Sequence, residues 1–520
     1  MKRMLFILCI IASITINESP AQDYPRIYGG NFHAFVDDVH ETYDKGFIIA
    51  GYANVPLNFS RFIWVIKTDV NGNILWNKKI GNWTRQFYLS GSEVTIDHGL
   101  IFSGATTKYG SFDPLFVKMD ACGEIEWCRV LTNPGDNWGK DIIKLGDESY
   151  IGMLAYYGEG DNYARISLIK LDQTGKPVWI QRLAQEDSLI TNEEGEHLLL
   201  TSENNVLVSG RCAYNSMNAF YILTDTSGSQ IWDLKWDSVT GICFQTTEHT
   251  YGKFYSIGYC ILPGTNNIPS IFKFDESGNE IESYLLVGDT IKQGGGRSIA
   301  RLNDSTLITG FVWGEKYPSE LIHSELAIID TLGNSIHRRF LVNNETEAPA
   351  DIITSFDDKI IVVGSYMVSN YFDIYLWKMN TNLEDDTLYT QSMTYDSLCP
   401  YEIQSDTMDL DCDLFVNIDE LPTKEEYEST VKISPNPAED WVALTLPDIV
   451  ASEKVEIAVY DVFGREVETG RRGDKEMGRQ GEVPVNRMVV LDVSGYPPGM
   501  YVVVVTDRKE RRYSGKMVIR

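Results

Sequence analysis

The sequence repeats one turn pattern at a steady spacing, and this repeat limits the folds open to the chain. The clearest copy is Asp69-Val70-Asn71-Gly72, followed by Ile74 and Trp76. Related copies begin at Asp120, Asp172, Asp225, Asp275, Asp330 and Asn380, so that successive copies are 50 to 55 residues apart. A constant period of this length predicts a stack of like structural units.

Each period contains signals for four short β-strands. In the first period, the apolar runs 47–51 and 62–67 are rich in β-branched and aromatic residues, which is typical of strands. The Asp of the pattern can bond to its own backbone and the Gly can adopt a positive φ, so the pattern predicts a hairpin turn. Four strands in about 50 residues is the size of one propeller blade.

These units predict an all-β chain with a seven-bladed β-propeller over residues 22–393. A ring of blades leaves no long exposed sheet edge, and no long window shows the 3.6-residue period of a helical repeat. A ring of six or eight blades is the alternative, because residues 394–416 carry no recognisable copy of the pattern.

The ends of the chain differ from its middle. Two basic residues precede the apolar run 4–14, and Ser19 and Ala21 provide the small side chains of a cleavage site. We therefore expect a secretory signal peptide over residues 1–21. No other stretch approaches the roughly 18 apolar residues of a membrane-spanning helix, so we expect no transmembrane segment. The formal net charge of −29 argues against nucleic acid and anionic membranes as partners.

An exported chain can form disulfides, and two pairs are predicted. Cys243 and Cys260 are equidistant from the hairpin dipeptide Tyr251-Gly252, so they should face each other across two strands. Cys399 and Cys412 flank a short polar loop, whose closure would stabilise the fold by roughly 3 kcal/mol. For each pair, two buried free thiols are the alternative. The fates of Cys122, Cys128 and Cys212 stay open.

Composition changes after the repeats. Residues 394–432 read as a polar linker that contains cysteines, and residues 433–520 alternate apolar and polar positions in short runs. This pattern predicts a small antiparallel β-sandwich.

Five motifs of this last region occur in a fixed order and together resemble a known family. They are Ser434-Pro435-Asn436-Pro437, Tyr460-Asp461 with Gly464-Arg465, Leu491-Asp492-Val493-Ser494, Pro498-Gly499-Met500-Tyr501 and Lys516-Met517-Val518-Ile519-Arg520. The set resembles the C-terminal (type A) sorting domain of the type IX secretion system, with a generic adhesion-type sandwich as the alternative. The resemblance implies a bacterial protein exported across the outer membrane, then secreted or attached to the cell surface. It also implies that the translocon reads Gly499, Tyr501 and the terminal strand from Lys516 to Arg520.

No motif predicts catalysis. The seven histidines form no HxxxH or HExxH pair, there is no Gly-x-Ser-x-Gly elbow, and Cys122 and Cys128 lack the spacing of a metal site. One carboxylate per turn is a poor calcium ligand set. We therefore expect no catalytic residues, no metal and no cofactor, and we lean toward a protein that is not an enzyme.

The loops between the second and third strands of the units carry most of the exposed aromatic candidates. Such rings suit amphipathic ligands such as glycans or peptides, although rings can also fill the wedges between blades. The candidate ligand-binding residues are Tyr52, Tyr109, Tyr157, Tyr214, Trp313, Tyr317 and Tyr371.

Three hypotheses for function follow. The first is an exported, monomeric, non-enzymatic propeller that binds a glycan, a peptide or a surface partner. The second is a secreted polysaccharide hydrolase or lyase, which a carboxylate pair in the central funnel would favour. The third is a purely structural surface module with a broad exposed apolar patch.

Overall fold

The computed structural model describes residues 24–520 with several gaps, and among the described residues every regular element is a β-strand. The segments outside the description are 55–59, 82–84, 133–134, 157–164, 184–191, 215, 237, 289–291, 316–321, 343–348, 417–420, 422–429, 447–453, 462–464, 466, 468–482, 485–487 and 508–511. The expected signal peptide, 1–21, lies outside the described residues. No helix in the described part is long and apolar enough to cross a membrane.

The repeats form antiparallel four-stranded sheets, numbered here in chain order and given from the inner to the outer strand. Sheet 1 holds β2 (His33–Glu41), β3 (Phe47–Asn54), β4 (Arg61–Thr68) and β5 (Ile74–Ile80). Sheet 2 holds β6 (Phe87–Val94), β7 (Leu100–Thr106), β8 (Asp113–Met119) and β9 (Ile125–Thr132). Sheet 3 holds β10 (Trp138–Lys144), β11 (Tyr150–Tyr156), β12 (Arg165–Leu171) and β13 (Pro177–Arg182).

The remaining sheets follow the same order. Sheet 4 holds β14 (Asn192–Leu200), β15 (Asn205–Tyr214), β16 (Ser216–Asp225) and β17 (Gln230–Lys235). Sheet 5 holds β18 (Thr240–Thr250), β19 (Lys253–Ile261), β20 (Asn267–Asp275) and β21 (Glu280–Leu285). Sheet 6 holds β22 (Gln293–Asn303), β23 (Thr306–Gly314), β24 (Ile322–Asp330) and β25 (Ser335–Val342). Sheet 7 holds β26 (Asp351–Thr354), β27 (Ile360–Val368), β28 (Tyr371–Met379) and β1 (Arg26–Tyr28).

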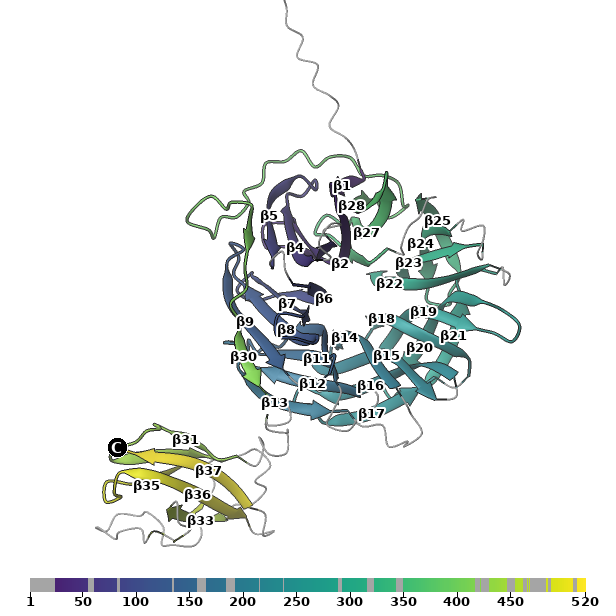
Figure 1. The fold of residues 1–520 in the computed structure, drawn as a ribbon. Helices are drawn as coiled ribbons and strands as arrows, with labels where there is room; N and C mark the ends of the chain where they lie inside the picture. Colours follow the sequence, from purple (N-terminus) through teal and green to yellow (C-terminus); the bar gives the residue numbers. More distant parts are fainter. Residues whose placement is uncertain are drawn as a thin grey trace, which may run out of the picture.

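The sheets are arranged around a common centre (Figure 1). The inner strands of consecutive sheets contact one another, and β26 contacts both β22 and β2. The N-terminal strand β1 pairs with β28, so the two ends of the repeat region meet in sheet 7. The predicted β-propeller is confirmed.

The repeated turn holds neighbouring sheets together. The Asp172 carboxylate accepts the backbone N–H groups of Thr174 and Lys176 at 2.9 and 3.0 Å, which fixes the turn. Gly175 adopts a φ of +76°, and a Cβ built there would lie 2.6 Å from the Trp127 ring of the preceding sheet. Because the ring lies directly on the glycine, the motif is explained by packing between sheets. The same kind of contact joins Trp76 to Gly123, Trp179 to Gly228, Trp232 to Gly278 and Tyr284 to Gly333.

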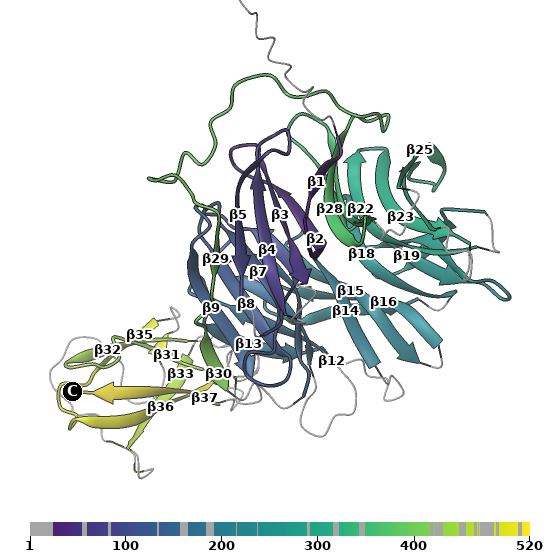
Figure 2. The same cartoon turned by 45° about the horizontal axis from the view of Figure 1, so that its top comes forward.

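Residues 389–416, here called the strap, first lie against the turns of sheet 1 and then run along the outer edges of sheets 1 and 2 (Figure 2). Its strand β29 (Asp406–Met408) lies parallel to β5, and β30 (Asp413–Val416) lies parallel to β9. The segment that we predicted to be part of a linker therefore contributes strands to two sheets.

Two disulfides attach the strap to sheet 2. They join Cys122 to Cys399 and Cys128 to Cys412, with Cα–Cα distances of 5.6 and 4.6 Å. The predicted Cys399–Cys412 bond was wrong, because the chain between these residues is extended along the sheet edges and each thiol meets a cysteine of sheet 2.

The predicted Cys243–Cys260 bond was also wrong. Both residues are buried free thiols. Two irregularities in the β18–β19 ladder shift the register, so Cys243 lies opposite Gly258 and Cys260 lies opposite Gly241. A count outward from the turn cannot anticipate such bulges.

The C-terminal region is a small two-sheet domain, as predicted. One sheet holds β31 (Lys432–Ser434), β32 (Trp441–Thr445) and β35 (Met488–Asp492), and the other holds β34 (Val483–Pro484), β33 (Lys454–Asp461), β36 (Gly499–Asp507) and β37 (Arg512–Ile519). Side chains of both sheets form one core, which includes Leu444, Val459, Val503 and Met517.

Candidate functional site

Two faces of the ring differ in their connections. One face, here called the turn face, carries the hairpins between the first and second strands and between the third and fourth strands of each sheet. The opposite face, here called the loop face, carries the connections between the second and third strands and those between consecutive sheets. Because inner strands begin at the loop face, their first residues lie beside the second-to-third loops. On this face the structure brings together aromatic side chains from four sheets.

These aromatic side chains form a chain of ring contacts, here called the aromatic band. Its members are Tyr371, His33, Phe372, Phe35, Tyr52, Tyr88, Phe112 and Trp138, and each is half-buried. Within the band, Phe35 stacks on Phe372 at 5.2 Å and on Tyr52 at 5.3 Å between ring centroids. Tyr52 contacts Tyr88 at 5.6 Å, and Tyr88 contacts Trp138 at 5.0 Å. The band therefore runs from sheet 7 through sheets 1 and 2 to sheet 3.

One cation lies against the middle of the band. The Arg61 guanidinium carbon is 4.3 Å from the centroid of the Tyr88 ring and 5.5 Å from that of Tyr52. A guanidinium over aromatic faces is a favourable cation–π arrangement. Burial raises the pKa of Tyr88, so its hydroxyl stays neutral, and it donates a hydrogen bond to the side-chain oxygen of Gln86 at 2.9 Å.

The structure places the predicted ligand-binding residues in different surroundings. Tyr52 and Tyr371 belong to the band, and Tyr109 is 37% exposed in the β7–β8 loop that also holds Phe112. Trp313 is only 7% exposed and packs in a hydrophobic core, so it does not line this surface. Tyr157, Tyr317 and the side chain of Tyr214 lie outside the described residues.

The sequence predictions missed the members of the band that lie on inner strands, because they considered only the second-to-third loops. His33, Phe35, Tyr88 and Trp138 come from the beginnings of inner strands. Their signal in the sequence is an aromatic residue at the first positions of a strand that follows an inter-sheet connection.

Carboxylates at the centre of the ring fasten neighbouring sheets. Asp141 accepts the N–H of Leu198 at 2.6 Å and that of Ile142 at 2.7 Å. Asp351 accepts the N–H of Val39 at 3.1 Å in the same way. Burial raises the pKa of Asp141 to about 7, although both hydrogen bonds oppose the shift. Since backbone donors occupy both oxygens of Asp141, we assign it a structural role rather than one in a catalytic pair.

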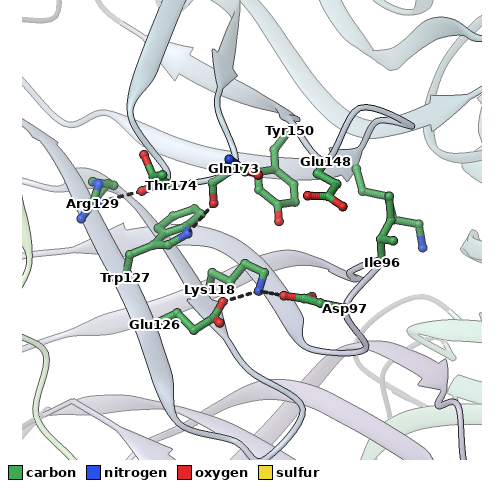
Figure 3. Close-up of a pocket in the computed structure, with 11 residues that line it drawn as sticks. Ile96, Asp97, Lys118, Glu126, Trp127, Arg129, Glu148, Tyr150, Gln173 and Thr174 are labelled. Carbon is green, nitrogen blue, oxygen red and sulfur yellow. Dashed lines mark hydrogen bonds and ion pairs between the residues drawn. The ribbon is translucent and has the colours of Figure 1, made fainter.

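A cavity of about 470 Å³ lies on the turn face between sheets 2 and 3 (Figure 3). Its lining residues are Ile96, Asp97, Lys118, Glu126, Trp127, Arg129, Lys144, Glu148, Tyr150, Gln173 and Thr174. Trp127 and Tyr150 form its aromatic wall, with ring centroids 6.1 Å apart. The sequence motifs give no sign of this cavity, because its lining residues come from seven separate strands and turns.

Buried lysines near the turn face form another feature that the motifs did not reveal. Lys67 contacts Asp44 at 2.5 Å, Lys118 contacts Asp97 at 2.6 Å, and Lys378 contacts Asp357 at 2.8 Å. The signal was present, since each lysine lies two residues before a turn pattern. These ion pairs brace the turns of one sheet. Groups of His, Cys, Asp and Glu that could hold a metal are absent from the described residues.

The predicted sorting-signal residues lie on the last two strands. Tyr501 is buried and its hydroxyl donates to the Pro497 carbonyl at 2.6 Å. Gly499 is exposed at the start of β36, and Lys516 and Arg520 are exposed along and after β37. Tyr501 thus supports the domain core, and the exposed residues are the ones a receptor can reach.

Comparison with known proteins identifies the C-terminal domain. Residues 432–520 match the family described as secretion system C-terminal sorting domain. The chain therefore carries a type IX sorting domain and is exported across the outer membrane, to a secreted or surface-attached form. No curated protein matches the sequence.

Several solved structures resemble the fold at low identity. Puromycin hydrolase aligns with a TM-score of 0.47 and 11% identity over 79% of this chain and 58% of its own. The GH93 α-L-arabinofuranosidase of Fusarium graminearum, solved with arabinobiose, aligns at 0.37 and 11% over 56% and 92%. A protein of unknown function from Bacteroides caccae aligns at 0.32 and 9% over 51% and 94%. These similarities are too distant to transfer an activity.

Proposed function

We propose that this chain is an exported binding protein that holds a glycan chain along the aromatic band. Sugar rings combine an apolar C–H face with a polar rim. Tyr52, Tyr88 and Tyr371 offer the matching combination of an apolar ring and a hydroxyl tip. The supporting observation is the continuous, half-buried run of rings across four sheets.

The residues of the band suit the binding of a glycan better than its hydrolysis. Its members carry no carboxylate, and Asp141 at the ring centre uses both oxygens to fasten sheets. Arg61 adds a positive charge over the middle rings, so we expect neutral or acidic glycans to be preferred over basic ones.

A glycan array probed with the exported chain tests this proposal. The variant Tyr52→Ala/Tyr88→Ala should lose at least about tenfold in affinity, as expected when aromatic side chains that the ligand covers are removed. Tyr401→Ala is the matched control, because Tyr401 is 84% exposed on the strap, outside the band.

Circular dichroism and thermal unfolding establish that each variant is folded. Equal glycan binding by a folded Tyr52→Ala/Tyr88→Ala variant would contradict the proposal. Binding of peptides alone on a parallel array, or turnover of a bound glycan, would also contradict it.

A further inference from the structure

The groove between sheets 1 and 2 on the turn face is filled by the strap, and we call it the covered groove. The N–H of Asp396 donates to the Asp44 carboxylate at 3.0 Å, and the N–H of Leu398 donates to the Tyr43 hydroxyl at 3.3 Å. Cys399 is bonded to Cys122 on the opposite wall. A four-residue segment, Asp396 to Cys399, therefore occupies this groove.

The cavity between sheets 2 and 3 is the next copy of the same groove, and we call it the open groove. The repeat places Asp97 where the covered groove has Asp44, Trp127 where it has Trp76, and Thr174 where it has Cys122. The Asp44 side chain is 1% exposed beneath the strap, whereas that of Asp97 is 54% exposed. The open groove therefore has the same kind of walls as the covered groove, and they are more exposed.

The strap itself continues past the open groove. Asp413 on β30 pairs with Arg129 at 2.7 Å, as Asp406 on β29 pairs with Lys78 at 3.0 Å one sheet earlier. The edge pairing is thus repeated, but the described strap residues contain no second segment that enters the groove.

Charge distinguishes the two grooves. The covered groove has Leu75 and His98 at the positions that Glu126 and Glu148 take in the open groove. Lys118 is neutralised by Asp97 and Glu126 together, while the Glu148 carboxylate has no ion-pair partner among the described residues.

The remaining cations of the open groove are also paired. Lys144 is held by Glu93, and Arg129 is held by Asp413. Burial raises the pKa of Tyr150, and the nearby carboxylates of Asp97, Glu126 and Glu148 raise it further. The Tyr150 hydroxyl points into the cavity between the two walls (Figure 3). With the pairing residues Glu93 and Asp413 counted, five carboxylates and three cations surround the cavity. The cavity therefore combines an aromatic wall with an excess of negative charge, which favours a cation.

We propose that the open groove binds a short segment of a partner protein through a basic side chain, in the position that Asp396 to Cys399 take in the covered groove. A lysine or arginine would lie against Tyr150 and pair with Glu148 and Glu126. The groove would thus take the charge opposite to the one that the strap carries.

Disulfide capture tests this site directly. The variant Thr174→Cys places a thiol at the position equivalent to Cys122, where the strap is attached. The full chain is equilibrated under mild reducing conditions with three capped peptides, Arg-Ser-Leu-Cys, Gln-Ser-Leu-Cys and Asp-Ser-Leu-Cys, and intact mass gives the captured fraction. The last of these repeats the sequence of strap residues 396–399. We expect the Arg peptide to be captured about tenfold more than the Gln peptide, and the Asp peptide least.

Two controls make the result specific. Ser277→Cys places a thiol at the same turn position of sheet 5, where Ile231 replaces Glu126, and should show no preference among the peptides. Adding Glu126→Gln and Glu148→Gln to Thr174→Cys should abolish the preference for Arg. Preferential capture of the Asp peptide, or equal capture of all three at Thr174→Cys, would overturn the proposal.

Discussion

The covered and open grooves are neighbouring copies of one structure, and they differ mainly in what fills them. Both have a tryptophan packed on the glycine of the next turn and a buried lysine paired with an aspartate. In the covered groove the chain supplies its own occupant and fixes it with a disulfide. In the open groove the same walls surround a cavity.

This comparison separates the residues of the repeat that build the ring from those that can contact a partner. The Asp-x-x-Gly turn and the tryptophan recur because each sheet must pack on the next. The residues around them vary in charge from groove to groove, as Leu75 and Glu126 show. Functional differences are therefore expected at these variable positions.

The largest expected effect on stability comes from removing the disulfides of the strap. Replacing Cys122, Cys128, Cys399 and Cys412 by serine should lower the free energy of unfolding by about 2–5 kcal/mol for each lost disulfide. Urea unfolding of the oxidised chain and of the variant measures the change. Chemical reduction of the wild-type chain should reproduce it, and unchanged stability would show that the strap does not hold the covered groove closed.

A smaller effect on the free energy of unfolding is expected when the aspartate of each lysine–aspartate ion pair is removed. Asp44→Ala leaves Lys67 buried without its partner and should cost about 3–5 kcal/mol. Asp97→Ala should cost at most about 1 kcal/mol, because Lys118 keeps Glu126 and the site is open to water. Equal losses of stability for the two variants in urea unfolding would contradict the conclusion that the strap shields only the covered groove from water.

The smallest expected effect is a pH dependence of the stability that Asp44 contributes. Burial alone would raise the pKa of Asp44, but the Lys67 ammonium and the Asp396 N–H outweigh it, so this pKa lies below its usual value. A carboxyl with a lowered pKa contributes stability above its unfolded pKa of about 4 and loses it as pH falls through the folded value. The stability difference between wild type and Asp44→Asn should therefore be full at pH 7 and shrink below about pH 4. A difference that stays constant between pH 7 and pH 3 would contradict this.

The sequence predicted the ring because the ring depends on a local pattern. The turn at Asp172 is fixed by its own side chain, and Gly175 is needed for the Trp127 contact, so both leave a regular trace. The sorting domain was predicted because its motifs lie in order near the end of the sequence. The disulfides were not predicted, because Cys122 and Cys399 are 277 residues apart and meet only through the path of the strap.

The candidate sites depend on contacts between sheets, which a linear pattern does not reveal. The aromatic band joins first-strand residues such as Phe35 to third-strand residues such as Phe372 across a sheet boundary. The open groove likewise joins Glu126 of sheet 2 to Glu148 of sheet 3. A repeat alignment finds equivalent positions, but only the folded strap shows which copy is filled.

A disulfide map of the secreted chain tests the central comparison most directly. Proteolysis without reduction, followed by mass spectrometry, should recover peptides that link Cys122 to Cys399 and Cys128 to Cys412, with Cys243 and Cys260 as free thiols. A Cys399–Cys412 link, or four free thiols at these positions, would place the strap elsewhere and remove the distinction between a covered and an open groove.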